Sequence, residues 1–360
     1  MIGKFSQNYI KNIYKLCKGE NMRYPRKLKK GDYIGVTAPS AGITNQVKLL
    51  RLDNVKNNFE KIGYKYIETE NVRTDIQGRS SSAKQRAEQF MKLWKDEKVG
   101  AIISATGGDF MPEILDELDF EELKSLEPKW FQGYSDNTNL TFILPTICDI
   151  ACIYGNTVKD FGMRKWHKTL NSSFEIMNEK EIEQESLEKC ETTEWTDSED
   201  PYEEYDLVNK VEWKNLNGEK KIKFKGRSIG GCFDVVVNLM GTKYDKVKDF
   251  IEKYKQDGIV WFLEVFEMST PQIYINLWKM KNAGYFENCK GIIFGRPLMV
   301  REDYEISYEQ TLKDALSNLD IPVIYDADIG HVSPQLPIVS GGILEVECEN
   351  GKGKIRNYFE

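Results

Sequence analysis

Short apolar runs alternate with segments of helical periodicity, and this alternation constrains the fold more than any other feature of the chain. The runs at Asp32–Ala38 and Val99–Ser104 have the length and composition of buried strands. Between them, Leu49–Ile62 carries apolar residues at helical spacing, and the pattern stops at Gly63. Strands that alternate with helices form a parallel sheet covered on both faces. The sequence therefore predicts an α/β fold.

The same criteria predict the other elements along the chain. In the first half they are strands at Tyr64–Ile67 and Lys129–Gln132 and helices at Ala83–Glu97 and Asn137–Ile147. In the second half they are strands at Ile259–Glu264, Gly291–Phe294, Val323–Asp326 and Gly342–Cys348 and helices at Asp234–Met240, Pro271–Ala283 and Tyr308–Ser317. A hairpin is also expected, because Lys210–Trp213 and Lys221–Lys225 flank the turn signal Asn217–Gly218.

A chain of 360 residues exceeds what one hydrophobic core usually covers, so we expect two domains. The predicted division is an N-terminal extension (1–29), an N-terminal α/β domain with a parallel, flavodoxin-like sheet (30–158), an acidic connection (159–206) and a C-terminal α/β domain with a mixed sheet (207–360). The connection is either a solvated linker or a lid or wall that approaches a pocket.

The charge, the apolar runs and the cysteines of the chain indicate which partners it binds and in which compartment it folds. There are 50 basic and 57 acidic residues, a net charge of −7, and no basic stripe, so we expect no nucleic-acid partner. The apolar runs are too short to span a membrane, and residues 1–21 lack a secretory signal; they form an upstream extension or a membrane-targeting segment. Seven dispersed cysteines without a CxxC motif indicate free thiols in the cytoplasm and no metal site.

Two residues that follow buried strands are candidates for chemistry. His331 comes just beyond the predicted strand Val323–Asp326, and the ends of parallel strands are where α/β sites are assembled. It is either a structural histidine or a proton shuttle, whereas His167 lies in the polar connection and is expected at the surface. Glu264 closes an apolar strand and needs a partner there: a salt bridge, a helix cap or a histidine that it orients.

A glycine turn follows the strand Val99–Ser104. It reads Gly107–Gly108–Asp109–Phe110–Met111–Pro112 and precedes a helix. A strand–turn–helix lets a side chain at the turn project over the sheet edge, beside free backbone N–H groups. Nucleotide binding at Gly107–Gly108 or Gly230–Gly231 is only weakly supported, because neither pair has a dinucleotide or Walker spacing.

Several segments in order resemble the LD-carboxypeptidase family of serine peptidases, and the long connection is most similar to its microcin immunity branch. The segments are KGDYIGVTAPS (30–40), IISATGG (102–108), FQGYSDNT (131–138), GRSIGGCFD (226–234), WFLEVFE (261–267), GIIFGRP (291–297) and DADIGHVSPQLPI (326–338). The resemblance implies a Ser–Glu–His triad that hydrolyses amides in peptidoglycan-derived peptides or peptidyl-nucleotide conjugates. It also implies a small peptide or aminoacyl ligand, no cofactor, and a homodimer.

On the matching positions, Glu264 is the triad glutamate, His331 is the triad histidine, and Gly107, Gly108 and Asp109 belong to the pocket. The nucleophile position holds Met111, whose thioether has no proton to lose. The next residue, Pro112, lacks the backbone N–H that commonly stabilises the oxyanion.

The sequence therefore predicts impaired or altered catalysis or, alternatively, a catalytically silent peptide- or aminoacyl-binding homologue. It predicts no labelling by a fluorophosphonate and no release of D-alanine from an L,D-tetrapeptide. Glu113 acting on a water is a third possibility. Other hydroxyls lie in neighbouring motifs but not at the projecting turn, namely Ser104, Thr106, Ser135 and Ser269.

Overall fold

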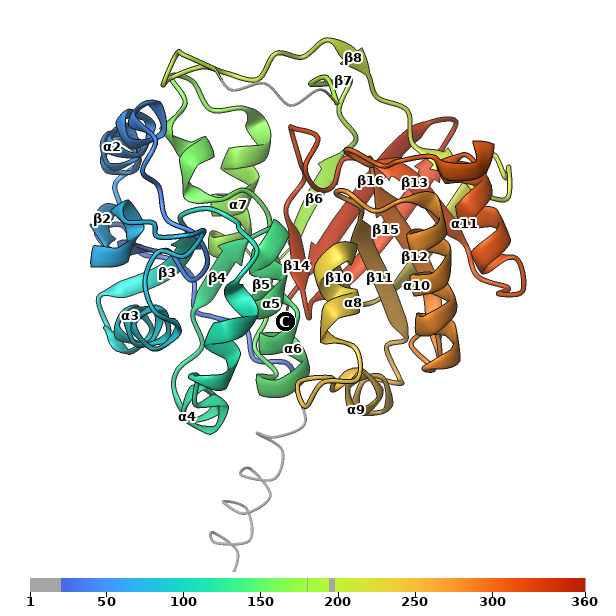
Figure 1. Ribbon diagram of the computed structural model, residues 1–360, viewed down its shortest axis with the longest axis horizontal. Coiled ribbons are helices and arrows are strands. Elements are labelled where there is room, and N and C mark those ends of the chain that lie inside the picture. The colour runs from blue at the N-terminus through green and yellow to red at the C-terminus, as the bar shows by residue number, and fades with distance from the viewer. Residues whose placement is uncertain (1–20, 180, 194–197, 360) are drawn as a thin grey trace, which may run out of the picture.

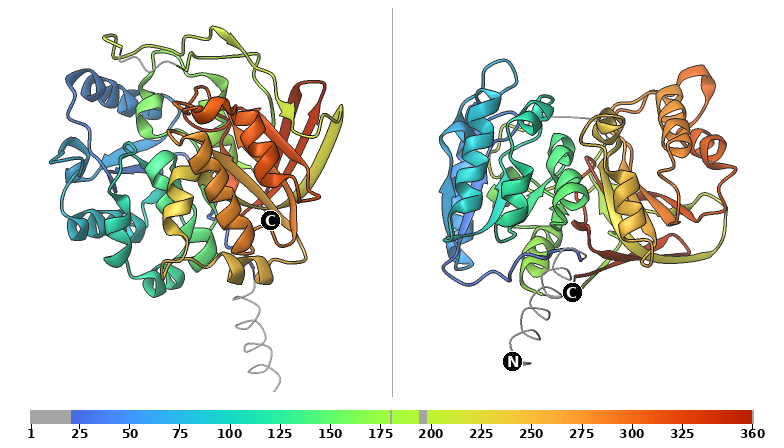
Figure 2. Two further views of the ribbon diagram at one scale, coloured as in Figure 1. Left: turned by 45° about the vertical axis from the view of Figure 1, so that its right-hand side comes forward. Right: turned by 90° about the horizontal axis from the view of Figure 1, so that it is seen from below.

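The computed structural model describes residues 21–179, 181–193 and 198–359, which form two α/β units lying side by side (Figures 1 and 2). Most of the expected N-terminal extension and Cys17 lie outside the described residues, as do residues 194–197 of the acidic connection. No helix in the described ranges combines the length and the apolar character needed to cross a membrane.

The first unit is built on a sheet with the strand order β14-β5-β4-β3-β1-β2 among the described residues. Its strands are β1 (Tyr33–Thr37), β2 (Lys65–Glu68), β3 (Val99–Ser104), β4 (Trp130–Gly133), β5 (Cys152–Tyr154) and β14 (Ile338–Ser340). All neighbours pair in parallel except β14, which is antiparallel to β5. The order 2-1-3-4-5 is that of flavodoxin-like folds, which place ligands at the carboxyl ends of the strands. The predicted flavodoxin-like sheet is confirmed.

Helices with apolar buried faces cover this sheet, and several of them begin at a residue whose side chain caps the helix. The helices are α2 (Gln46–Lys61), α3 (Ala83–Lys95), α4 (Phe120–Ser125), α5 (Thr138–Thr141), α6 (Ile143–Cys148) and α7 (Lys168–Asn178). Shorter 3-10 turns are η1 (Glu70–Arg73), η2 (Met111–Asp116), η3 (Ser135–Asn137) and η4 (Val158–Gly162). The side chain of Ser82 accepts the Gln85 backbone N–H, and the buried face of α3 includes Phe90 and Trp94.

The second unit is built on a mixed sheet, as predicted, with the order β6-β16-β15-β10-β11-β12-β13-β9 among the described residues. Its strands are β6 (Glu181–Glu185), β9 (Lys214–Asn215), β10 (Lys221–Cys232), β11 (Ile259–Glu264), β12 (Cys289–Gly295), β13 (Val323–Ala327), β15 (Ile343–Glu349) and β16 (Lys352–Tyr358). Strands β10 to β13 are parallel, and the flanking pairs are antiparallel. Beside the sheet lie α8 (Phe233–Leu239), α9 (Val247–Lys253), α10 (Thr270–Asn282), α11 (Tyr308–Leu316) and η5 (Asp303–Glu305).

The expected hairpin around Asn217–Gly218 does not form, so that prediction is wrong. The tight turn exists, with Gly218 at φ 76° and its N–H donated to the Asn215 carbonyl. However, β9 pairs with β13, and β10 pairs with β15 and β11. Of the first expected strand, Lys210–Trp213, only Lys210 lies in a strand: it belongs to β8 (Asn209–Lys210), which pairs with β7 (Lys189–Cys190).

The two units share strands and contacts. Strand β14 comes from the C-terminal half but extends the first sheet, and β6 comes from the connection but extends the second. Between the units, the backbone N–H of Cys232 donates to Thr138 Oγ1 at 3.0 Å. Gly231 is required at this contact, because a Cβ there would lie 2.7 Å from the Thr138 side chain. The carboxyl ends of β4 and β11 are therefore held at the junction of the units.

Candidate active site

Glu264 and His331 meet at this junction. Glu264 ends β11 and is completely buried, and its Oε2 lies 2.9 Å from His331 Nδ1. Its other oxygen, Oε1, accepts a hydrogen bond of 2.6 Å from the hydroxyl of Tyr154 in β5. Gly330 at φ 95° makes room for this pair, because a Cβ there would lie 2.6 Å from Glu264 Oε2. Both carboxylate oxygens thus have partners, and the carboxylate orients the histidine ring.

The ring of His331 is packed between two aromatic rings. Phe266 stacks on it with centroids 4.3 Å apart, and Tyr134 meets it edge-on at 5.0 Å. Only 4% of the His331 side chain is exposed. The packing leaves the ring little rotational freedom, so the position of Nε2 is fixed.

Arg296 holds the loop that carries His331. Its guanidinium pairs with the buried Asp328 and donates to the carbonyls of Val332, at 2.9 Å, and Pro334, at 3.0 Å. Asp328 also accepts from the backbone N–H of Leu187 and the Trp213 indole, so the acidic connection is tied to the same loop.

The outer nitrogen of the histidine contacts a serine. His331 Nε2 lies 2.9 Å from Ser135 Oγ. Ser135 lies two residues after the end of β4, is partly exposed, and has φ 63°, a left-handed conformation that is uncommon outside glycine. With the ring proton on Nδ1, facing Glu264, Nε2 accepts the Ser135 hydroxyl proton. As expected, Ser135 does not lie on the glycine turn after β3; it lies on a second strand–turn–helix, the one after β4, and there it contacts the histidine.

Met111, at the expected nucleophile position, points into the hydrophobic core. Met111 begins η2, is completely buried in the main apolar core, and donates its backbone N–H to Asp136 Oδ2 at 2.9 Å. Asp109 and Pro112 on the same turn are exposed. Gly107 faces the serine, because a Cβ on it would lie 3.1 Å from Ser135 Oγ. Gly108, at φ 148°, would clash with Ser40 if it carried a side chain.

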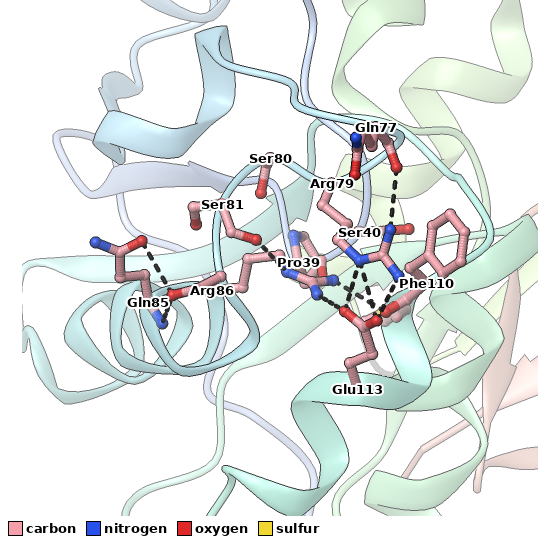
Figure 3. Close-up of polar contacts among 12 residues, drawn as sticks. Pro39, Ser40, Gln77, Arg79, Ser80, Ser81, Gln85, Arg86, Phe110 and Glu113 are labelled. Atoms are coloured by element: carbon pink, nitrogen blue, oxygen red, sulfur yellow. Dashed lines mark hydrogen bonds and ion pairs between the residues drawn. The ribbon is translucent and has the colours of Figure 1, made fainter.

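Glu113 does not face the histidine. Figure 3 shows its carboxylate between Arg79 and Arg86, with Arg79 Nε at 3.0 Å and Arg86 Nη2 also in contact. The hydrogen bond from Arg79, followed by that from Arg86, lowers the pKa of Glu113. A carboxylate held in this way is a poor base for activating water. Arg86 also donates to the carbonyls of Pro39 and Phe110, so Arg79, Arg86 and Glu113 together stabilise the glycine turn.

A cavity of about 320 Å³ opens beside His331. His331 and Tyr134 line it from the site, and much of the remaining wall comes from the acidic connection: Lys159, Asp160, Met163, Glu191, Thr192, Ser198, Asp200, Glu203, Glu204, Tyr205 and Asp206. Burial, followed by the charge of Asp160, raises the pKa of Glu191. In Figure 1 the connection, which includes β7, lies at the top of the molecule, and β8 follows it there. Of the two interpretations of the connection, the structure supports a wall over a pocket.

His167 has a structural role. Its Nδ1 accepts the backbone N–H of Thr169 at the start of α7, and its ring packs edge-on against Tyr205 at 5.8 Å. Burial lowers its pKa. The side chain is half-buried rather than a solvated surface group.

The first sheet has a flavodoxin-like order, and a serine, a histidine and a glutamate meet where the two α/β units join, an arrangement typical of serine hydrolases. The chain belongs to the LD-carboxypeptidase family. Residues 34–155 match the model of the LD-carboxypeptidase N-terminal domain, and residues 225–346 match that of the C-terminal domain. The predicted family is confirmed.

Relatives in sequence and structure agree with this family. The chain is 25% identical to the putative carboxypeptidase YocD of Bacillus subtilis, over 92% of this chain and 98% of that protein. It is also 25% identical to the microcin C7 self-immunity protein MccF of Escherichia coli, over 90% and 92% of the two chains. The crystal structure of an MccF-like protein from Bacillus anthracis has the same fold, with a TM-score of 0.77 and 23% identity over 94% of this chain and 99% of that one.

Proposed function

We propose that this protein is a hydrolase that cleaves amide bonds in small peptide or aminoacyl substrates, in the manner of a carboxypeptidase. One observation carries the proposal: His331 is held by Glu264 at 2.9 Å on one side, and its other nitrogen points at a hydroxyl group. A histidine oriented by a buried carboxylate is the general base of acyl-transfer hydrolases. The names of the relatives, putative carboxypeptidases and a microcin self-immunity protein, support the substrate class.

We assign a role to each group from its position in the site. His331 removes a proton from the oxygen that attacks the amide carbonyl and then gives it to the leaving nitrogen. Glu264 stabilises the imidazolium that forms between these steps and keeps the reactive tautomer. Tyr154 holds Glu264 in place, and the cavity beside His331 receives the substrate. Peptidoglycan-derived peptides and peptidyl-nucleotide conjugates are the two substrate groups to examine.

A catalytically silent binding protein is the second candidate. The burial of Met111 favours it, because no nucleophile stands on the turn after β3, and so does Pro112, which has no N–H to offer there. Such a protein would hold a peptide or aminoacyl ligand in the cavity without turning it over. For either candidate, we also propose that the protein is cytoplasmic and forms a homodimer.

Hydrolysis of defined substrates separates the two candidates. We expect the purified protein to release D-alanine from an L,D-tetrapeptide or to cleave an aminoacyl-nucleotide amide, which reverses the expectation drawn from Met111. His331→Ala should abolish turnover, while a variant of the helix-capping histidine, His167→Asn, should keep it because Asn also caps helices well. Binding of both substrates without turnover by the wild-type protein would establish the silent alternative.

A further inference from the structure

We propose that a second copy of this chain docks on an exposed apolar surface of the second unit, with α10 of one copy packed antiparallel against α10 of the other. The inference gives a surface to the homodimer named above, and it rests on that part of the proposed function. It does not depend on whether the site hydrolyses its substrate.

Six large apolar side chains are exposed on α10 and on the loop that precedes α11. They form what we call the apolar patch: Tyr274, Ile275, Trp278, Met299, Tyr304 and Ile306. Every other exposed large apolar side chain of the described residues lies before residue 209. Exposed apolar side chains that stand singly are normal on a protein surface, but a group of them marks an interaction site.

Hydrogen bonds hold the loop against the start of α10, so the patch is one surface. The Thr270 N–H donates to the Arg301 carbonyl at 3.0 Å, and the Asp303 N–H donates to Thr270 Oγ1 at 3.1 Å. The α10 members of the patch are spaced three and four residues apart, so they share one face of the helix. Helix α10 lies on the outside of the second unit, beside α11 (Figures 1 and 2).

The composition of the patch is that of an interface core. Four of its six members are Tyr, Trp or Met, which are enriched where two proteins meet. Trp278 is 54% exposed and Tyr304 is 83% exposed. Trp and Tyr are also the residues that most often carry the binding energy of an interface. Burial of these rings against a second copy removes apolar surface from water, and this is the main favourable term in association.

The tip of the loop projects a tyrosine at the N-terminal end of α10. Tyr304 and Glu305 have φ values of 58° and 60°, which are left-handed and cost free energy for residues with a side chain. Two such residues in succession make a sharp turn, and the ring of Tyr304 stands out from it. Strained backbone of this kind concentrates in segments that bind a ligand or switch conformation.

A groove of about 470 Å³ lies at the other end of α10. Trp278, Lys279 and Asn282 line it from α10, and Lys248 lines it from α9. The groove is large enough to receive an aromatic ring. The two ends of α10 therefore differ in shape, because the N-terminal end carries a projecting ring and the C-terminal end carries a hollow.

The two ends of α10 also differ in charge. Lys279 and Lys281 lie in the last turn of the helix, whereas Glu302 and Glu305 lie in the loop at its N-terminal end. Within the part of the chain that the structure describes, none of these four side chains has an ion-pair partner. Each end of α10 thus complements the other end in both charge and shape.

A second copy satisfies this complementarity through a two-fold axis across the middle of α10. In such a contact the same surface is used by both copies, so each contact forms twice. With the two helices antiparallel, Tyr304 of one copy enters the groove beside Trp278 of the other, and Glu305 approaches Lys279. Parallel helices would instead place the glutamates of the two loops side by side, where like charges repel.

Sedimentation equilibrium of the full chain over a range of concentrations tests the surface. We expect the wild-type protein to have twice the mass of one chain at high concentration. Ile275→Asp and Tyr304→Asp should each raise the dissociation constant of the dimer by at least about 25-fold, and both should fold because these side chains are exposed. The matched control is Ile76→Asp, which places the same charge on an isoleucine that is 72% exposed outside the patch. It should remain a dimer.

A charge exchange tests the antiparallel arrangement. Lys279→Glu and Glu305→Lys should each weaken the dimer, because each places like charges together across the two-fold axis. The double variant restores opposite charges at both contacts and should recover most of the wild-type affinity. Failure of the double variant to recover would overturn this arrangement.

The outcomes separate this inference from the proposed function. A dimer that persists in Ile275→Asp and Tyr304→Asp would overturn the proposed surface and leave the homodimer standing on another one. A wild-type protein that stays monomeric at every concentration would overturn both, even if the patch bound a lipid vesicle or another protein. Hydrolysis measured on the same samples tests the hydrolase function separately, because the mass of the particle does not report on turnover.

Discussion

The hydroxyl of Tyr154 gives a quantitative test of how the site is held together. Tyr154→Phe removes one hydroxyl and keeps the ring. The lost hydrogen bond, 2.6 Å long, joins this hydroxyl to the completely buried carboxylate of Glu264. A hydrogen bond to a charged group contributes about 1.5–3 kcal/mol. The second contact, 3.4 Å from Ser135 N, is too long to add much. The free energy of unfolding should therefore fall by about 1.5–3 kcal/mol.

Denaturant unfolding followed by fluorescence and circular dichroism measures this change. The matched control is Tyr308→Phe, because Tyr308 is also buried but its hydroxyl has no hydrogen-bond partner among the described residues. Its removal should change the stability by less than about 0.5 kcal/mol or increase it. We also expect kcat of Tyr154→Phe to fall about tenfold, since 1.4 kcal/mol corresponds to that factor. If the two variants were equally stable, Tyr154 would not anchor Glu264 and the reasoning would be refuted.

Three further predictions concern the surroundings of the site. Met111→Ser should destabilise the protein by about 2–4 kcal/mol without raising the rate of hydrolysis, because the side chain lies in the core; thermal melts and the hydrolysis assay check both. Arg296→Met should lower the free energy of unfolding by about 3–5 kcal/mol, because it leaves the buried Asp328 without its cationic partner. Arg301→Met, which breaks an exposed ion pair, should lower it by less than about 1 kcal/mol in the same melts. Glu113 has a lowered pKa, so its stabilisation is present above the ordinary glutamate pKa and lost as the pH falls through the folded-state value. The melting temperature of Glu113→Gln should thus lie below that of the wild type at neutral pH and approach it in acid; a constant difference would contradict this.

Periodicity predicted most of the fold because the core elements are locally encoded. The strand Val99–Ser104 was predicted with its observed bounds, as was Ile259–Glu264, since both are buried apolar runs. The hairpin at Asn217–Gly218 failed for a tertiary reason. The turn signal is local and the turn forms, but the partners of β10 lie more than thirty residues away in the chain, where local patterns carry no information.

The candidate site was predictable only in part. Glu264 and His331 were identified from their places after buried strands and from the family resemblance, and the structure brings them together. Ser135 was not distinguished from Ser104, because the sequence does not give the φ of a residue or the distance between two units. The glycine two residues before Ser135, directly after a buried strand, is the signal that could have singled it out.

The central claim is that Ser135, His331 and Glu264 form one hydrogen-bonded series in which the histidine accepts the serine proton. A crystal structure of the protein after reaction with a fluorophosphonate tests this claim most directly. We predict continuous electron density from phosphorus to Ser135 Oγ, a phosphonyl oxygen against the backbone N–H of Asp136, and His331 still bonded to Glu264. Two results would contradict the account. One is electron density that joins phosphorus to another side chain, and the other is an unmodified Ser135 whose hydroxyl is still hydrogen-bonded to His331.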